Sequence, residues 1–548
     1  MEKLFLVGST AQKLREAHLE DLRHRDSHLP TVSFTTTSGR YENLDESSEG
    51  TGTARVDVVA ARSASSTASG DPLRRPDGSV GDFPATFTVD QAVDKIGFGK
   101  FQLKLSCLAG FAWMADAMEM MILSILSPAL KCEWELAGWQ QALVTTVVFC
   151  GMMMSSAAWG KVSDHYGRRV ELLLCSFITF FYGLISAGAP NFLWLLFLRC
   201  LVGIGIGGAP QSVTLYSEFL PSKQRAKCLV LTEIFWALGS CFEVLLALFI
   251  MPTLGWRWLL GLSSIPLLIF DIACLWMPES ARFYMASGQT DKAYAILVRI
   301  AKENGVAMPP GELVTDAGKA KDTAPRGRFL DLIGPDFRRT TLLLWTIWLG
   351  NAFSYYGVVL MTTELLGVGD TCHVGTEAAL PLPACDLECR MLTTADYWDL
   401  LWTTVAEFPA LFITALIIDL LGRKRTMALE FVVYAIFVFL LSICTSRIIM
   451  TLFLFVARGF ISGAFQTAYV YTPEVYPTSM RSIGLGMCSA MARIGAIVTP
   501  FNSQVMLNYS VYGAICIYGS VALAAAVASL LLPIETKGRE MKDTRVAH

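Results

Sequence analysis

Residues 160–169 read GKVSDHYGRR, and residues 415–424 read ALIIDLLGRK. In each stretch an acid, Asp164 or Asp419, is followed three residues later by glycine and two basic residues. The two acids are separated by about 255 residues, which is a first sign of an internal repeat.

Two further landmarks repeat at nearly the same separation. YSEFLPSKQRAK at 216–227 is similar to YTPEVYPTSMRS at 471–482, and PESAR at 278–282 is similar to PIETKGR at 533–539. A separation shared by three landmarks indicates a duplicated unit. Two parallel repeats around a central site are an architecture of membrane transporters.

The composition is that of a membrane protein. The chain has 548 residues, of which 53% are hydrophobic and only 17% charged, whereas soluble domains average about 25% charged residues. The net charge of −3 argues against nucleic-acid binding, which needs a basic surface.

Twelve apolar stretches are long enough to cross the hydrocarbon layer as helices. The predicted fold class is therefore an all-α membrane protein with two six-helix halves. The predicted spans are 104–130, 139–160, 170–189, 191–219, 226–251, 256–277, 340–366, 396–418, 426–445, 448–473, 482–507 and 510–532.

Five regions follow from these spans. We expect a disordered cytoplasmic tail at 1–86, an N-terminal six-helix half at 87–277, a cytoplasmic linker at 278–339, a C-terminal half at 340–533 and a short tail at 534–548. Within the linker, TDKAYAILVRIAKENG has apolar residues at helical spacing, which predicts a surface helix.

Lysine and arginine are concentrated in alternate connections between the spans, which predicts that both termini are cytoplasmic. The basic residues of the cytoplasmic set are Lys161, Arg168, Arg169, Lys223, Arg225, Lys227, Arg338, Arg339, Arg423, Lys424, Arg425, Lys537 and Arg539.

Cysteines in the opposite set of connections lie where oxidation is possible. We predict one or two disulfides among Cys132, Cys372, Cys385 and Cys389. A metal site at the last two with His373 is the alternative, but the ligand spacing is poor, so no metal is expected.

The pattern G-x-x-x-D-x-x-G-R-R, formed by Gly160, Asp164, Gly167, Arg168 and Arg169, resembles the signature loop of the major facilitator superfamily. The second copy, with Asp419 and Arg423, has alanine in place of the leading glycine. The glycines that follow Arg199, together with PESAR, resemble the sugar and organic-ion branches of the superfamily.

This resemblance implies that the loop after the second helix acts as a conformational latch on the cytosolic face. Glu279 and Arg282 of PESAR have a similar implied role. The alternative is that the arginines only fix the topology, which would leave Asp164 unexplained.

FAWMADAMEMMILSI at 111–125 places Asp116 and Glu119 inside a predicted span. An acid there costs roughly 2.5–3.5 kcal/mol on insertion scales, which favours a functional role. Three residues apart on a helix, the two acids should share one inward face. We predict Asp116 as the leading proton or cation site with Glu119 as its partner; a polar contact between helices is the alternative.

Six other residues inside the spans complete the predicted substrate or proton site: Arg199, Glu233, Tyr355, Tyr356, Glu407 and Arg493. The tyrosines can stack on a flat ligand or simply pack between helices. At the position of Arg493, similar organic-anion transporters carry Arg and organic-cation transporters Asp, which implies an anion or a zwitterion. The acids of the first span favour a cation, and a zwitterion or a proton-coupled anion reconciles the two.

No nucleophile with a placed base is recognisable, so neither an enzyme nor a cofactor is expected. The predicted function is proton-coupled transport of a small organic ion by a monomer that spans a lipid membrane and binds no nucleic acid. Stretches such as PQSVTLYSEFLP resemble a vesicle-membrane subgroup of the family, which implies synaptic or secretory vesicles. The alternative is a transport-inactive protein of the same fold that serves as a receptor or trafficking partner.

Overall fold

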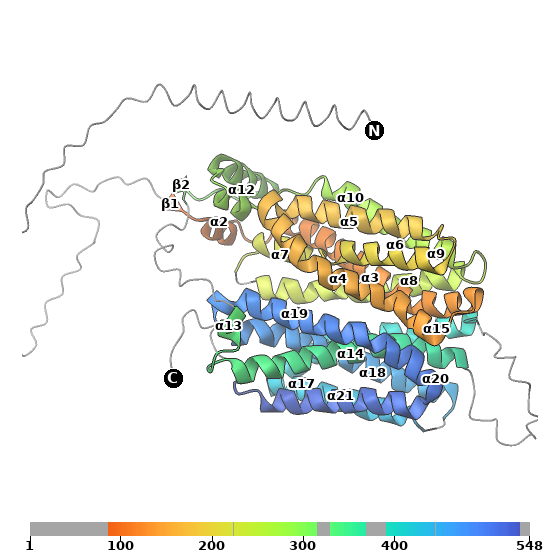
Figure 1. Ribbon diagram of the computed structural model, residues 1–548. Coiled ribbons are helices and arrows are strands. Elements are labelled where there is room, and N and C mark those ends of the chain that lie inside the picture. The colour runs from red at the N-terminus through yellow and green to blue at the C-terminus, as the bar shows by residue number, and fades with distance from the viewer. Residues whose placement is uncertain (1–85, 223, 315–328, 369–390, 444, 538–548) are drawn as a thin grey trace, which may run out of the picture. The chain divides into compact units, whose positions relative to one another are not determined.

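The structured region of the chain is almost entirely helical. The computed structural model describes residues 86–222, 224–314, 329–368, 391–443 and 445–537 (Figure 1). Among these residues a single pair of short strands occurs, in which β1 (Thr86–Phe87) lies parallel to β2 (Glu312–Leu313). The predicted disordered tail lies outside the described residues except for Thr86, its last residue, which belongs to β1.

The N-terminal half contains the first six predicted spans. They correspond to α3 (Lys100–Trp134), α4 (Gly138–Tyr166), α5 (Arg168–Ser186), α6 (Phe192–Ile206) continued by α7 (Pro210–Glu218), α8 (Arg225–Ile250), and α9 (Trp256–Ser263) continued by α10 (Ile265–Cys274).

The C-terminal half contains the other six. They correspond to α14 (Arg338–Val368), α15 (Thr394–Val405) continued by α16 (Glu407–Leu421), α17 (Arg423–Leu440), α18 (Arg447–Val475), α19 (Thr478–Pro500) continued by η3 (Phe501–Met506) and α20 (Leu507–Tyr509), and α21 (Val511–Leu531).

Among the described helices, 11 spans are long and apolar enough to cross a membrane. The one predicted span outside this set is 426–445, which corresponds to α17. Its 18 residues begin with Arg-Lys-Arg and include Glu430, so it carries too much charge to belong to the set. The predicted twelve-helix fold is thereby confirmed.

Prolines account for two of the breaks inside spans. The ring of a proline clashes with the carbonyl group four residues earlier. Accordingly, α6 ends at Ile206, four residues before Pro210, and α15 ends at Val405, four residues before Pro409.

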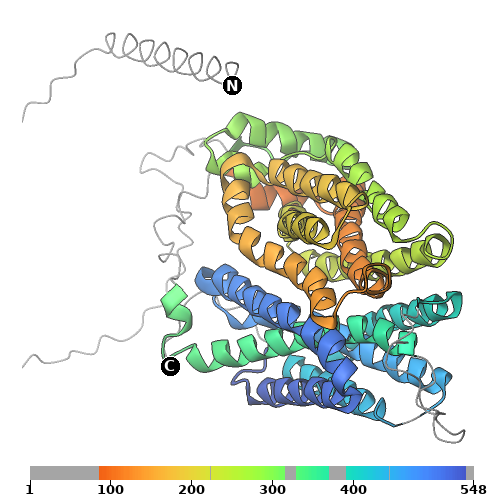
Figure 2. The ribbon, with the colours of Figure 1, turned by 45° about the vertical axis from the view of Figure 1, so that its right-hand side comes forward.

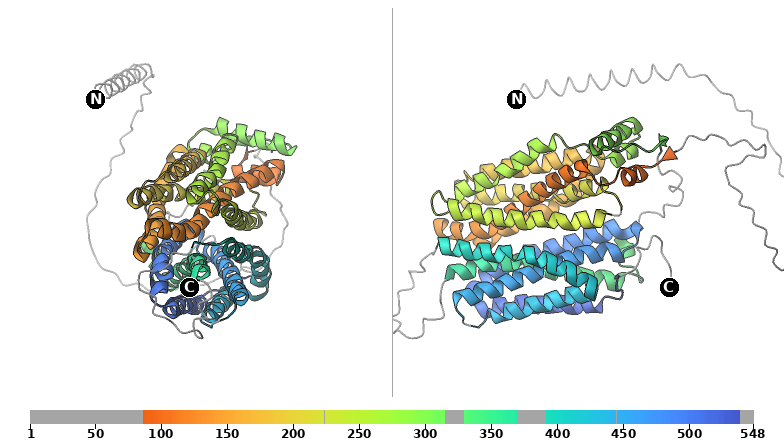
Figure 3. Two further views of the ribbon diagram at one scale, coloured as in Figure 1. Left: turned by 90° about the vertical axis from the view of Figure 1, so that its right-hand side faces the viewer. Right: turned by 180° about the vertical axis from the view of Figure 1, so that it is seen from behind.

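The two halves are separate bundles that meet along a few helices (Figure 2). Within the N-terminal half α3 packs on α8 and α4 on α6, whereas in the C-terminal half α14 packs on α19 and α17 on α18. Between the halves, α19 packs on α4 and α15 on α8. Seen end-on, the red-to-green and the green-to-blue helices form two groups (Figure 3).

A small helical cluster covers one end of the N-terminal half. We call this end of the molecule, at which α5 and α17 begin, the linker face of both halves. The cluster contains α2 (Val89–Ile96), α11 (Ala281–Ala286) and α12 (Thr290–Asn304), at the left end of the long helices in Figure 1. Its apolar core is formed by Phe87, Val89, Ala92, Val93, Ala281, Met285, Ala293 and Leu297.

The helix predicted in the linker is confirmed as α12, with its predicted apolar face buried against α2 and α11. The helix α2 was not predicted. A usable signal was present, because Thr88 caps the helix and Val89, Val93 and Ile96 recur at helical spacing. The apolar face of α2 is buried against α11 and α12.

Candidate functional site

A pocket lies between the two halves. Its walls come from α3, α4, α6, α7 and α8 of the first half and from α14, α18 and α19 of the second. Seven aromatic residues form much of the lining: Trp113, Phe149, Trp236, Tyr355, Tyr356, Phe465 and Tyr469. A concave, mostly apolar site with a few polar groups is typical of small-molecule binding.

Two acids of the N-terminal half line this pocket. Asp116 is buried and also borders a smaller cavity among α3, α5, α6 and α10. None of the described residues donates a hydrogen bond to Asp116 or forms an ion pair with it. Glu233 accepts a hydrogen bond from the indole Nε1 of Trp113 at 3.4 Å. Asp116 is thus the acid most available to a ligand or a proton.

Arg493 is the one basic side chain among the described residues that line the pocket. Its Nη1 donates to the carbonyl oxygen of Met152 at 3.2 Å and to Ser156 Oγ, both on α4. The guanidinium group therefore bridges the two halves while it faces the pocket.

Glu119 does not line the pocket. Its Oε2 forms an ion pair with Arg199 Nη1 at 2.9 Å inside the N-terminal half, where the two side chains are only 2% and 0% exposed. The prediction that Asp116 and Glu119 both point inward from one face of the helix is therefore wrong. The angle between side chains three residues apart is enough for one acid to reach the pocket and the other to reach α6.

The C-terminal half contains a comparable buried pair. Glu407 Oε1 accepts from Arg458 Nε at 2.9 Å and from the hydroxyl group of Tyr355 at 3.0 Å. Trp236 Nε1 of the other half donates to the same hydroxyl at 2.8 Å. Tyr356 lies in the pocket, with its ring 4.8 Å from that of Phe149.

Arg458 was not among the predicted site residues. An arginine in the middle of the apolar stretch FLFVARGFISGAF was a usable signal, because intramembrane charges are rarely without function. Its partner, Glu407, could not be read from the sequence, because the two residues are 51 positions apart on different helices.

Three further hydrogen bonds between described residues of the two halves lie away from the linker face. Gln141 Nε2 donates to Glu364, Gln504 Nε2 donates to Ser127 Oγ at 2.7 Å, and Thr146 Oγ1 donates to the carbonyl oxygen of Ile497 at 3.2 Å. The structure therefore shows a state in which the halves are joined on the side opposite the linker.

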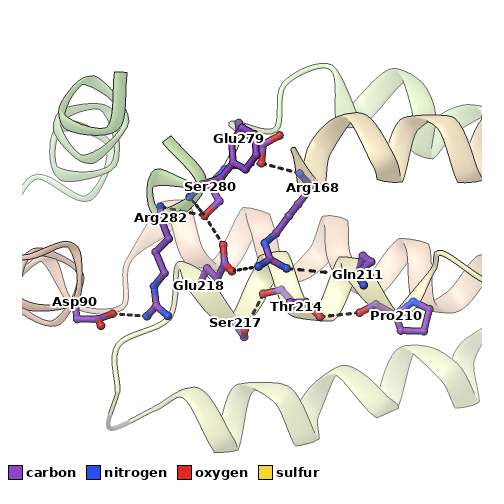
Figure 4. Close-up of polar contacts among 11 residues, drawn as sticks. Asp90, Arg168, Pro210, Gln211, Thr214, Ser217, Glu218, Glu279, Ser280 and Arg282 are labelled. Carbon is purple, nitrogen blue, oxygen red and sulfur yellow. Dashed lines mark hydrogen bonds and ion pairs between the residues drawn. The ribbon is translucent and has the colours of Figure 1, made fainter. Parts of the chain in front are cut away.

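On the linker face, Glu279 binds the start of α5 (Figure 4). Its carboxylate accepts from the backbone N–H groups of Arg168 at 3.1 Å and Arg169 at 3.0 Å, which are unpaired donors at a helix N-terminus. Arg168 Nη2 pairs with Glu218 Oε1 at 2.9 Å. Gly167, directly before the helix, has φ = 102°.

A second copy of this arrangement lies in the C-terminal half. Glu535 accepts from the backbone N–H groups of Arg423 at 2.8 Å and Lys424 at 3.2 Å, while Arg423 pairs with Glu474 at 3.2 Å. The preceding glycine, Gly422, has φ = 85°. The repeated landmarks of the sequence are therefore residues that contact one another.

The two signature aspartates contribute little to these networks. Asp164 is exposed and forms no ion pair with any described residue, and Asp419 is 82% exposed with Arg423 at 3.9 Å. Arg282 pairs with Asp90 of α2, not with Glu279. In this state the linker-face networks join elements within each half, so a latch between the halves remains a prediction, as does the role of Gly160.

Of the predicted disulfide cysteines, only Cys132 is described, and it is disulfide-bonded. Cys372, Cys385 and Cys389 lie outside the described residues. All other described cysteines are free.

Two similar helix bundles around a shared, charged pocket define a membrane transporter. A family model described as sugar (and other) transporter matches residues 99–376, and one described as major facilitator superfamily matches residues 398–547. The chain belongs to the major facilitator superfamily and is a multi-pass membrane protein, not a member of an enzyme class.

Curated relatives match along nearly the whole chain. The synaptic vesicle 2-related protein of Xenopus laevis is 54% identical over 531 residues, which are 96% of this chain and 95% of the relative. The synaptic vesicle 2-related protein of Rattus norvegicus is also 54% identical, over 94% of this chain and 93% of the relative. Organic cation/carnitine transporter 7 of Arabidopsis thaliana is 38% identical over 84% of this chain and 96% of the relative.

Solved structures share the fold. The xylose transporter XylE from E. coli in its inward open conformation has a TM-score of 0.63 at 16% identity, over 80% of this chain and 98% of that one. Its partially occluded inward open conformation has a TM-score of 0.64 at 18% identity, over 80% and 99%.

We predict that Arg199→Met lowers the free energy of unfolding by about 3–5 kcal/mol, because it leaves the Glu119 carboxylate buried without its counter-charge. The matched control is Arg257→Met. Its pair with Glu133 is 43% and 34% exposed, so about 0–1 kcal/mol is expected. Denaturant titration in detergent micelles measures both, and equal losses would contradict the assignment.

We predict that Gly167→Ala costs about 1–2 kcal/mol of stability, since a residue with a Cβ atom is strained at φ = 102°. The added methyl group would also overlap Glu279 Oε2 and displace the helix cap. Gly160→Ala is the control, because nothing lies within 4 Å of the added atom. The difference in thermal unfolding midpoint between the two variants is the test.

Proposed function

We propose that this protein carries a small organic ion across a vesicle membrane by alternating access, with the central pocket as its binding site. The observation that carries the proposal is that both halves supply the pocket walls and both contribute charged groups to them. If the halves rock about such a site, the bound ion is exposed to each side in turn.

The charges of the pocket favour a ligand that bears a positive group. Among the described residues that line the pocket, Asp116 and Glu233 are acidic and Arg493 is basic. The lining therefore has an excess of negative charge when all three are ionised. Aromatic rings at Trp113 and Trp236, whose centroids are 5.3 Å apart, add favourable contacts for an ammonium group. Arg493 can bind a carboxylate of the same ligand. A zwitterion fits both, in keeping with the name of the Arabidopsis relative, an organic cation/carnitine transporter.

Proton coupling is the second element of the proposal. Asp116 has no cation beside it among the described residues and borders the pocket, so it can exchange a proton when the ligand leaves. Glu119 forms an ion pair with Arg199, whereas Asp116 has no such partner among the described residues, which supports Asp116 rather than Glu119 as the proton site. The tightly paired Glu119 then positions α3 against α6.

We further propose a vesicle location with both termini in the cytoplasm. The names of the synaptic vesicle 2-related relatives support the location. The basic residues of the linker face, among them Arg168, Arg169, Arg423 and Lys424, support its cytoplasmic side. We expect a monomer, since one chain supplies the whole pocket.

The decisive experiment uses the purified full-length chain in liposomes with an imposed pH gradient and a panel of labelled organic cations, anions and zwitterions. Accumulation of a zwitterion or a cation that dissipates with the gradient supports the proposal. Accumulation of none, together with tight binding of a protein partner, favours the alternative of a transport-inactive receptor.

We predict that Asp116→Asn removes the dependence of transport on the pH gradient, because an amide cannot exchange the proton. Counterflow, which needs no net proton movement, should persist. Asp291→Asn, an exposed acid on α12, is the matched control and should behave as the unaltered protein. A full pH dependence in Asp116→Asn would end the proton assignment.

We also predict that Arg493→Gln shifts selectivity from zwitterions toward simple cations. The variant loses the group that binds the carboxylate, and each good charged hydrogen bond contributes about 1.5–3 kcal/mol, or at least tenfold in affinity. Competition assays with matched amines and amino acids measure the ratio. An unchanged ratio would show that Arg493 acts only as a bridge to α4.

A further inference from the structure

Trp276 lies at the point where α10 leaves the bundle on the linker face. The preceding residues Ile269, Ile272 and Leu275 are 51%, 62% and 64% exposed, so this side of α10 faces lipid. Trp276 itself is 37% exposed. Tryptophan is enriched at the boundary between hydrocarbon and headgroups, so its ring marks the level of the membrane surface.

Two cations from different elements flank this ring. Lys104 Nζ of α3 lies 5.7 Å from the ring centroid, and the guanidinium carbon of Arg299 of α12 lies 5.2 Å from it. Both side chains are exposed. Lys100 is exposed one turn before Lys104, and Leu103 between them is 58% exposed, as expected for a helix side that passes from headgroups into acyl chains.

One acid partly offsets these charges. Glu303 pairs with Lys104 at 2.5 Å and is 20% exposed. Arg299 donates through Nη2 to the backbone carbonyl oxygen of Trp276 at 3.1 Å and forms no ion pair with any described residue. The cluster therefore keeps an excess of positive charge, with guanidinium donors directed at the membrane boundary.

We propose that Lys104, Trp276 and Arg299 form a binding site for the headgroup of an anionic phospholipid. The site has two cations at the membrane surface, and the guanidinium group of Arg299 can bind phosphate through several N–H groups. Two cations complement a headgroup that has a phosphate and a second acidic group. The cytoplasmic leaflet is the anionic one, so the inference relies on the orientation given under the proposed function.

Occupation of the site would join the linker to the bundle. Arg299 belongs to α12 of the linker, whereas Lys104 and Trp276 belong to the first and sixth spans. A bound headgroup would hold these three elements together as one body, in addition to the hydrogen bond from the Phe101 backbone N–H to Asn304 Oδ1 at 2.9 Å.

The opposite face supplies a matched control. There Arg257 lies 4.3 Å from the ring of Trp256, a similar cation over a similar ring. Glu133 contacts both: its Oε1 pairs with Arg257 at 2.6 Å, and its other oxygen accepts from the indole N–H of Trp256. One cation and one acid leave no excess charge, so no anionic lipid is expected there.

Native mass spectrometry of the full-length protein in detergent, with added phosphatidylserine or phosphatidylcholine, tests the proposal. We expect retained phosphatidylserine adducts at least fivefold above phosphatidylcholine. The double variant Lys104→Gln/Arg299→Gln should lose that excess, at about fivefold for each basic residue removed. Arg257→Gln should keep it.

Glu303→Gln provides a gain-of-binding test that a folding defect cannot mimic. Removal of the competing acid should raise phosphatidylserine retention about fivefold, with phosphatidylcholine unchanged. The proposal would be overturned by equal retention of both lipids, or by unaltered phosphatidylserine retention in the double variant. Displacement of phosphatidylserine by millimolar inorganic phosphate would also overturn it, because the site would then bind free phosphate. Since lipid adducts are measured without transport, failure of the transport assay would be seen separately.

Discussion

An ionised side chain inside a hydrocarbon layer has to meet a counter-charge or face water, and the arrangement of both halves follows from this constraint. Arg199 meets Glu119 in one half, and Arg458 meets Glu407 in the other. Two further acids of the spans, Asp116 and Glu233, line the pocket. Glu243 and Glu430 are instead buried within their halves, where they accept hydrogen bonds from hydroxyl groups. The charges that hold each half together are thereby separated from those available to a ligand.

The linker-face networks connect helices within each half. Glu279 and Glu535 satisfy the free N–H groups at the start of α5 and α17, and Arg168 and Arg423 pair with acids at the end of the fourth span of each half. Contacts between the halves are fewer and lie mainly on the opposite side. Strong contacts within bodies and weak ones between them are what a rocking motion requires.

Arg493 is the exception, because it belongs to the pocket and also bridges the halves. A bound anion would compete with α4 for the N–H groups of the Arg493 guanidinium. A ligand carboxylate could therefore loosen one contact between the halves as it binds, which would link occupancy of the pocket to the change of state.

Hydropathy and repeated motifs determined the number of spans, their approximate ends and the duplication, because the transfer of a helix into lipid depends on its own residues. The stretch predicted at 448–473, for example, is the helix Arg447–Val475. The partners of the buried charges were decided by tertiary structure alone. Whether Glu119 faces the pocket or Arg199, whether Asp164 meets a cation, and whether α2 has anything to pack on depend on which distant helices lie beside them. Those neighbours are set by packing of the whole bundle, which no local pattern contains.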